Sequence, residues 1–200
     1  MADPKVCLFW DNSNIHNSVS NNILNISTHA RNISSHKKNY IPPNIRISFL
    51  ELFKLAVAGR EVGKIFVVGS EKEQGGDVYF HGKMGWQEKL KEQTGIEIES
   101  FERGSISGAE QGVDQVLQAH MLRAVLDHKN DPQIAVLLNG DGEGYENGVG
   151  FHADLKRMHK EGWGIEVIAW HEACSILMRE WANEVGVLYK TWRLLQRCYI

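Results

Sequence analysis

The sequence has few cysteines and no long hydrophobic run, and each shortage excludes a class of protein. Its three cysteines, Cys7, Cys174 and Cys198, are odd in number and far apart, so they match neither a disulfide framework nor a zinc-ligand pair. The longest clean apolar run, residues 134–138, is too short to cross a bilayer. The start, MADPKVCLFWDN, lacks the basic segment and long apolar run of a signal peptide. We therefore expect a cytoplasmic protein with no membrane partner.

A positive charge excess is also lacking. The net charge is -3, so no global positive field attracts nucleic acid, and any such binding must come from local patches. The hydrophobic share of 42% and the charged share of 24% are ordinary for a globular protein. A length of 200 residues suits one domain with its own core, so we expect residues 1–200 to form a single domain.

Acidic residues are absent between Asn12 and Leu50, where Asn, Ser and His dominate and Arg31, Lys37 and Lys38 add positive charge. The stretch is longer than a normal connection between a strand and a helix, which predicts an insertion at residues 17–45. Two interpretations stay open. The insertion is either a solvated loop or a basic, aromatic arm that contacts phosphates and bases.

Short β-type runs alternate with helix-type stretches, which is typical of an α/β fold with a parallel sheet covered on both faces. The predicted strands are residues 5–10, 64–69, 95–101, 134–138 and 164–170. The predicted helices are residues 48–58, 113–126, 151–160 and 172–185. We expect residues 171–200 to form a C-terminal helical extension. If its end is helical, Lys190, Arg193 and Arg197 share one face, either solvated or facing nucleic acid.

Three aspartates occupy informative positions. Asp11 directly follows the first predicted strand, Asp141 follows the strand at 134–138 by a few residues, and Asp114 begins the helix at 113–126. In an open parallel sheet, ligands gather beyond the carboxyl ends of the strands, so these carboxylates could converge there. Such a cluster suits Mg²⁺ or Mn²⁺. The alternative for each aspartate alone is a helix cap.

Other common sites are excluded by their motifs. The sequence contains no P-loop, no correctly spaced dinucleotide-binding fingerprint, no HExxH and no GxSxG. The segment that starts at Asp141 is not an EF-hand loop, because Tyr145 and Glu146 stand where a ligand and a glycine belong.

Three segments resemble the motifs of NYN domains, which belong to the PIN-like group. Residues 9–14 (FWDNSN) resemble the opening strand of these domains, residues 111–114 (QGVD) the second motif, and residues 138–143 (LNGDGE) the third. Their order agrees, and the resemblance covers residues 5–170. It implies a PIN-like three-layer sandwich with a mostly parallel central sheet of about five strands flanked by helices. Characterised members of the family include metal-dependent ribonucleases.

The resemblance also implies roles for individual residues. Asp11, Asp114 and Asp141 would bind Mg²⁺ or Mn²⁺, Asn14 would orient the site or a substrate phosphate, and Glu143 would take a longer-reaching part. The chain departs from the family at Asn139, where a small hydroxyl residue is usual, and at His120, where many members carry an acid. Residues 144–150 form an apparent insertion.

We therefore predict a metal-dependent nuclease that hydrolyses phosphodiester bonds in single-stranded RNA. Arg31, Lys37, Lys38 and Arg103 are the predicted contacts to the RNA backbone. One alternative is a catalytically inactive module that binds RNA or acts as a scaffold. Another is a small-molecule phosphohydrolase, although Ser13 stands where one such family needs a second aspartate. A homodimer or a protein partner stays open.

Overall fold

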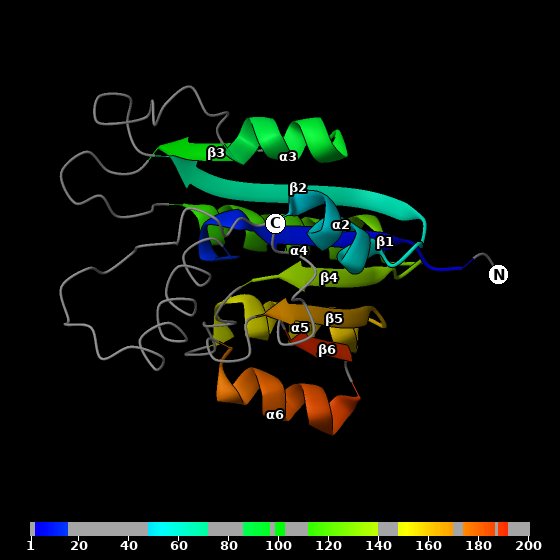
Figure 1. Cartoon of the computed structure of the whole chain (residues 1–200). Coiled ribbons are helices and arrows are strands. Elements are labelled where there is room, and N and C mark those ends of the chain that lie inside the picture. Colours follow the sequence, from blue (N-terminus) through cyan, green and yellow to red (C-terminus); the bar gives the residue numbers. More distant parts are fainter. Residues whose placement is uncertain are drawn as a thin grey trace, which may run out of the picture.

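A computed structural model describes most of the chain. The described residues are 3–15, 48–71, 86–96, 99–102, 112–139, 148–169, 174–186 and 188–191. Over these residues the chain forms an α/β fold, as the alternation of strand-type and helix-type segments predicts (Figure 1). The predicted insertion at residues 17–45 lies outside the described residues.

Over the described residues the sheet contains six strands, and every neighbouring pair is parallel. The strands are β1 (Val6–Asp11), β2 (Val62–Glu71), β3 (Glu99–Glu102), β4 (Ile134–Leu138), β5 (Gly164–Ala169) and β6 (Leu188–Thr191). Their order across the sheet is β3-β2-β1-β4-β5-β6. The chain thus builds one half of the sheet outward from β1, then crosses back and builds the other half outward from β4. The order in which strands are added reverses between the parallel neighbours β1 and β4, and this position is the topological switch point of a doubly wound sheet.

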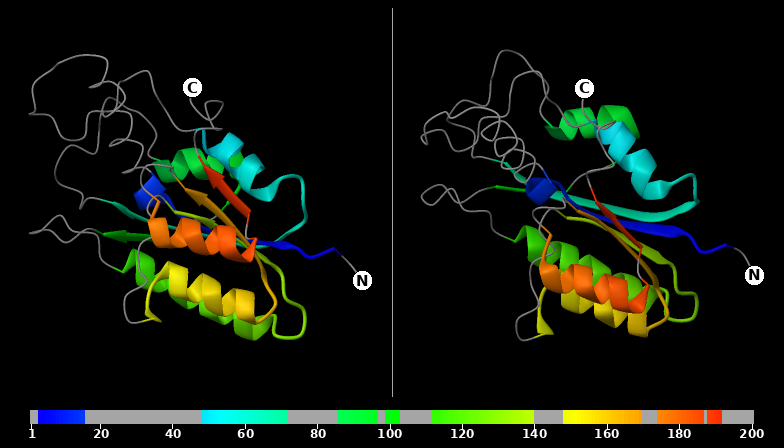
Figure 2. Two further views of the ribbon diagram at one scale, coloured as in Figure 1. Left: turned by 90° about the horizontal axis from the view of Figure 1, so that it is seen from below. Right: turned by 60° about the horizontal axis from the view of Figure 1, so that its bottom comes forward.

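Helices cover both faces of this sheet (Figure 2). The helices are α2 (Phe49–Val57), α3 (Trp86–Thr94), α4 (Val113–Asp127), α5 (Phe151–Lys160) and α6 (Ile176–Val185). Alternate residues of a strand point to opposite faces. Accordingly Leu8 and Trp10 share a core cluster with α2 and α3, whereas Cys7 and Phe9 share another with α4, α5 and α6.

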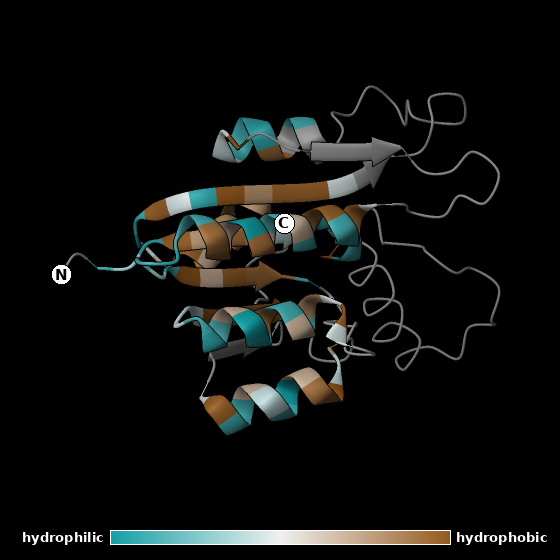
Figure 3. Ribbon diagram, turned by 180° about the vertical axis from the view of Figure 1, so that it is seen from behind, coloured by the Kyte–Doolittle hydropathy of each residue, from teal (hydrophilic) through white to brown (hydrophobic). Residues whose placement is uncertain are grey.

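The central strands are apolar on both faces because both faces are covered. All six residues of β1 are buried, and the coloured strands in Figure 3 are mainly hydrophobic, whereas the helices mix hydrophilic and hydrophobic residues. A continuous apolar run is what a strand buried on both sides requires. Among the described residues, no helix has the length and apolar character needed to span a membrane.

Three details differ from the sequence predictions. The sheet has six strands where about five were expected. Helix α3 was not predicted. Within residues 171–200, where a helical extension was expected, the structure describes helix α6 and, at residues 188–191, the parallel strand β6 beside β5. Lys190 therefore lies in a strand, so the condition under which Lys190, Arg193 and Arg197 would share a helical face is not met at Lys190.

Candidate functional site at the switch point

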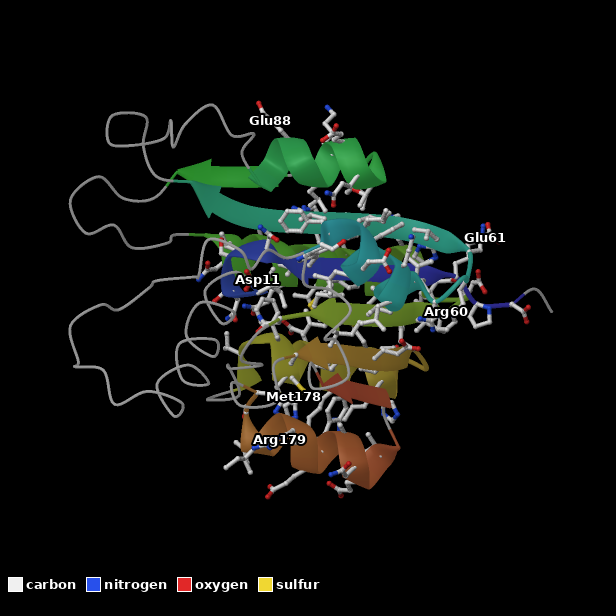
Figure 4. The ribbon with its side chains drawn as sticks, in the orientation of Figure 1. Asp11, Arg60, Glu61, Glu88, Met178 and Arg179 are labelled. Atoms are coloured by element: carbon white, nitrogen blue, oxygen red, sulfur yellow. The ribbon has the colours of Figure 1, made fainter. Side chains whose placement is uncertain are left out.

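Asp11 is the last residue of β1 and lies at the switch point (Figure 4). The residue is buried, with 2% of its surface exposed. Its Oδ1 accepts a hydrogen bond of 2.9 Å from the backbone N–H of Asn14, so Asp11 caps the helical residues 12–15. The capping role considered from the sequence is therefore real at this position. This bond uses Oδ1, and a carboxylate accepts several bonds.

Asn139 connects the end of β4 to the same carboxylate. Trp10 pairs with Leu138 in the register of β1 and β4, so the next residues, Asp11 and Asn139, lie side by side. The Asn139 Nδ2 group donates a hydrogen bond of 3.3 Å to Oδ2 of Asp11, and Asn139 is 1% exposed. The first and third motifs of the sequence thus meet through a buried side-chain contact, which sequence reasoning noted only as a departure from the family.

The polar side chains at this edge form a buried layer where apolar packing would be expected. Asp11, Asn12, Ser13 and Asn139 are all buried. Oδ1 of Asn12 is buried with no hydrogen-bond partner, and an unsatisfied buried amide oxygen costs about 1–3 kcal/mol. The donors here are carboxylate, amide and hydroxyl oxygens, the types that a hard cation such as Mg²⁺ or Mn²⁺ prefers. The chemistry of the layer therefore fits the predicted metal.

Asp114 is the second residue of α4, and its side chain is exposed. It does not cap the helix, because the N-cap is Gly112, whose φ of 85° suits glycine and which has no side chain to offer. The capping alternative is therefore excluded for Asp114. A negative charge in the first turn remains favourable beside the positive end of the helix dipole.

His120 locates the start of α4 relative to Asp11. Its ring stacks on Phe66 with centroids 4.2 Å apart, and Phe66 pairs with Phe9 in the register of β1 and β2. From His120 back to Asp114 the helix rises about 9 Å, and from Phe9 to Asp11 the strand rises about 7 Å. Because a helix that links parallel strands runs antiparallel to them, Asp114 reaches the edge where Asp11 lies. His120 instead takes a packing position, where the family often has an acid.

The first turn of α5 buries two titratable side chains that the sequence did not single out. His152 is 1% exposed and its ring lies 5.2 Å from that of Trp181 in α6. Asp154 is 2% exposed and pairs with Arg157 at 2.6 Å. Burial raises the pKa of Asp154, and the Arg157 charge opposes that shift. Arg157 also donates to the carbonyl of Gly148 at 2.5 Å, and this bond links α5 to the residues that directly precede it.

We expect His152 to make the protein less stable in mild acid. Burial, and then the nearby Lys156 charge, lowers the pKa of His152 to about 4 from 6.5. As the pH falls from 6.5 to about 4, His152 therefore becomes protonated in the unfolded chain but stays neutral in the folded chain. The free energy of unfolding should fall by about 3 kcal/mol across this window.

The measurement is urea unfolding of wild type and His152→Phe at a series of pH values. Asp154 acts in the opposite sense. Its carboxyl pKa is raised in the folded state, so protonation of this carboxyl as the pH falls increases the free energy of unfolding. It is present in both proteins, so the difference between their pH profiles isolates His152. Parallel profiles between pH 6.5 and 4 would contradict the assignment.

The remaining predicted site residues lie outside the described part of the chain. They are Asp141, Glu143, Arg31, Lys37, Lys38 and Arg103. Within the described ranges, no group of three or more His, Cys, Asp or Glu side chains is arranged to hold a metal ion. In the described residues, Asn14 and Asn139 each donate a hydrogen bond to Asp11. The packing of α4 places Asp114 at the same edge.

Comparison of the chain with protein-family models, with curated proteins and with solved structures found no match.

Proposed function

We propose that this protein is a metal-dependent nuclease that hydrolyses phosphodiester bonds in single-stranded RNA, with an NYN-type, PIN-like domain. The observation that carries the proposal is the buried hydrogen bond between Asp11 and Asn139. It joins the first and third acidic motifs at the switch point, where doubly wound sheets bind ligands. Asp114, which is exposed and is not the N-cap of α4, adds a second carboxylate at the same edge.

Asp141 completes the proposed acid set through chain connectivity. It follows Asn139 by two residues in the sequence, and two residues of chain span at most about 7 Å. Asn139 in turn contacts Asp11. The same strand order occurs in dinucleotide-binding sheets, but the residues after β1 are Asn-Ser-Asn-Ile and contain none of the glycines that such sites need.

In the proposed reaction, Asp11, Asp114 and Asp141 hold Mg²⁺ or Mn²⁺, and Glu143 adds a longer carboxylate arm. The cation, when bound, supplies Lewis-acid stabilisation and activation of water. Asn14 orients the site or a substrate phosphate, and its backbone N–H already fixes one oxygen of Asp11. Arg31, Lys37, Lys38 and Arg103 contact the RNA backbone electrostatically.

The test is cleavage of an end-labelled single-stranded RNA by wild type and by Asp141→Asn, in Mn²⁺ and in EDTA. We expect cleavage only with the metal and only with Asp141 intact. Asp127→Asn is the control, because Asp127 is an exposed carboxylate at the far end of α4, paired with Lys64. Activity of Asp141→Asn equal to that of the control would discard the acid cluster as the catalytic centre.

A second function, an inactive module that binds RNA, is favoured by one observation. His120 stacks on Phe66 where the family often carries an acid. Tight RNA binding by folded wild type without cleavage in Mn²⁺ would select this alternative. Hydrolysis of p-nitrophenyl phosphate without cleavage of RNA would select the small-molecule phosphohydrolase.

A further inference from the structure

Asn139 is held more firmly than its position after a strand requires. Its backbone N–H donates to the carbonyl of Ile168 in β5 at 3.2 Å, which extends the sheet ladder one residue beyond β4. Its side chain, 1% exposed, donates to Oδ2 of Asp11. The residue therefore links β5, β4 and β1 at the edge where the proposed metal ligands lie.

The two oxygens of Asp11 are consequently oriented by two different groups. Oδ1 accepts from the backbone N–H of Asn14, and Oδ2 accepts from the Asn139 side chain. Both donors are themselves fixed, the first within the helical residues 12–15 and the second by β5. A buried carboxylate held at both oxygens has one orientation, and an oriented ligand loses less freedom when a cation binds.

We propose that Asn139 is a positioning residue that holds Asp11 in the geometry required for binding the divalent cation. The inference rests on the proposed function and goes beyond it, because Asn139 acts through Asp11 and does not touch the metal or the RNA.

The other end of β4 provides a matched control. Gln133 is also a buried amide residue that directly flanks β4 and ties it to the chain beside β1. Its Oε1 accepts from the backbone N–H of Lys5 at 2.6 Å, and its Nε2 donates to Asp131. Gln133 and Asn139 thus make comparable links at opposite edges of the sheet, and only Asn139 lies beside Asp11.

The experiment compares wild type, Asn139→Leu and Gln133→Met in three measurements. These are the unfolding midpoint in urea, the Kd for Mn²⁺ from electron paramagnetic resonance, and kcat and KM for RNA cleavage. Leucine has nearly the shape of asparagine but cannot donate, so Asp11 loses one anchor. We expect Asn139→Leu to weaken Mn²⁺ binding about 10–100-fold, the range for partners of metal ligands, and to lower kcat while KM for RNA is unchanged.

Both variants lose a buried hydrogen bond, so both unfold at lower urea concentrations. Gln133→Met should nevertheless keep the Mn²⁺ affinity and kcat of wild type. Equal Mn²⁺ affinity in all three proteins would overturn the positioning role, and so would equal losses in both variants. In either case cleavage by wild type would still support the nuclease. If wild type binds Mn²⁺ but does not cleave RNA, the affinities alone decide the inference. If wild type neither binds Mn²⁺ nor cleaves, both proposals fall.

Discussion

Replacing Asp114 with asparagine is expected to lower kcat for RNA cleavage in Mn²⁺ by at least about 10-fold without unfolding the protein. The loss of a partner to a metal ligand typically costs 10–100-fold, so loss of a proposed ligand should cost no less. The fold should tolerate the change because Asp114 is exposed and does not cap α4. Surface substitutions of this kind usually alter stability by less than about 0.5 kcal/mol.

Asp127→Asn is the appropriate control, because it makes the same chemical change on the same helix. Asp127 lies at the last residue of α4, and its contact is a surface ion pair with Lys64 at 2.6 Å. That pair lowers the pKa of Asp127, with the Lys64 hydrogen bond as the first cause. The control should cleave RNA at the rate of wild type. If Asp114→Asn does so as well, Asp114 does not bind the metal.

Replacing Arg60 with methionine is expected to lower the free energy of unfolding by about 3 kcal/mol, the low end of the usual cost of removing one partner of a buried ion pair, because the Arg60 side chain is 26% exposed. Arg60 binds both oxygens of Glu166 at 2.5 and 3.0 Å. Its side chain also donates to the carbonyls of Ala56 and Val57 at the end of α2. The Glu166 side chain is only 10% exposed, so the variant leaves its carboxylate buried without this partner.

The double variant Arg60→Met/Glu166→Met tests that cause. It also removes the Glu166 carboxylate and should recover most of the lost stability, short of about 1 kcal/mol for the bonds to α2. Lys5→Met is the control, since Lys5 forms an exposed ion pair with Glu61, and Glu61 lies at the same end of the sheet as Arg60 (Figure 4). Exposed pairs contribute little, so its urea midpoint should hardly move. A double variant as unstable as the single one would contradict the role of Glu166.

The central part of the fold follows from sequence because pattern and environment agree there. Residues 134–138 and 151–160 have the bounds that were predicted. The apolar run of β4 is a strand buried on both faces, and α5 has an apolar face spaced for a helix. The α/β fold with a parallel sheet flanked by helices is therefore confirmed, while the PIN-like family stays a proposal.

The elements that the sequence analysis did not predict, α3 and β6, lie where the local sequence pattern carries little information. Helix α3 (WQEKLKEQT) is mostly polar, and Leu90 is the buried apolar residue described on it. Strand β6 has four residues, and only its pairing with β5 distinguishes it from the helix suggested by the basic spacing. Tertiary contacts override propensity in such short segments.

In the candidate site, too, some features could be predicted from the sequence and others could not. That Asp11 ends a strand was predictable, because the preceding residues are continuously apolar. A helix cap by Asp11 was one of the alternatives that the sequence left open, and its carboxylate does cap residues 12–15. That the carboxylate also accepts from Asn139 was not predictable, since this partner is 128 residues away in sequence. Likewise the stacking of His120 on Phe66 depends on how α4 packs over β2, which no local pattern specifies.

The position of β1 in the middle of the sheet also has a consequence during synthesis on the ribosome. Its neighbour β4 begins beyond Gln133, whose side chain meets Lys5 across 128 residues of chain. At a translation rate of 5–20 residues per second, roughly 6–26 s pass before that neighbour exists. Over this interval the backbone N–H and C=O groups of β1 that later pair with β4 have no native partner strand. Early strands of this kind are natural binding segments for chaperones, and the nascent chain should depend on them until residue 138 has emerged.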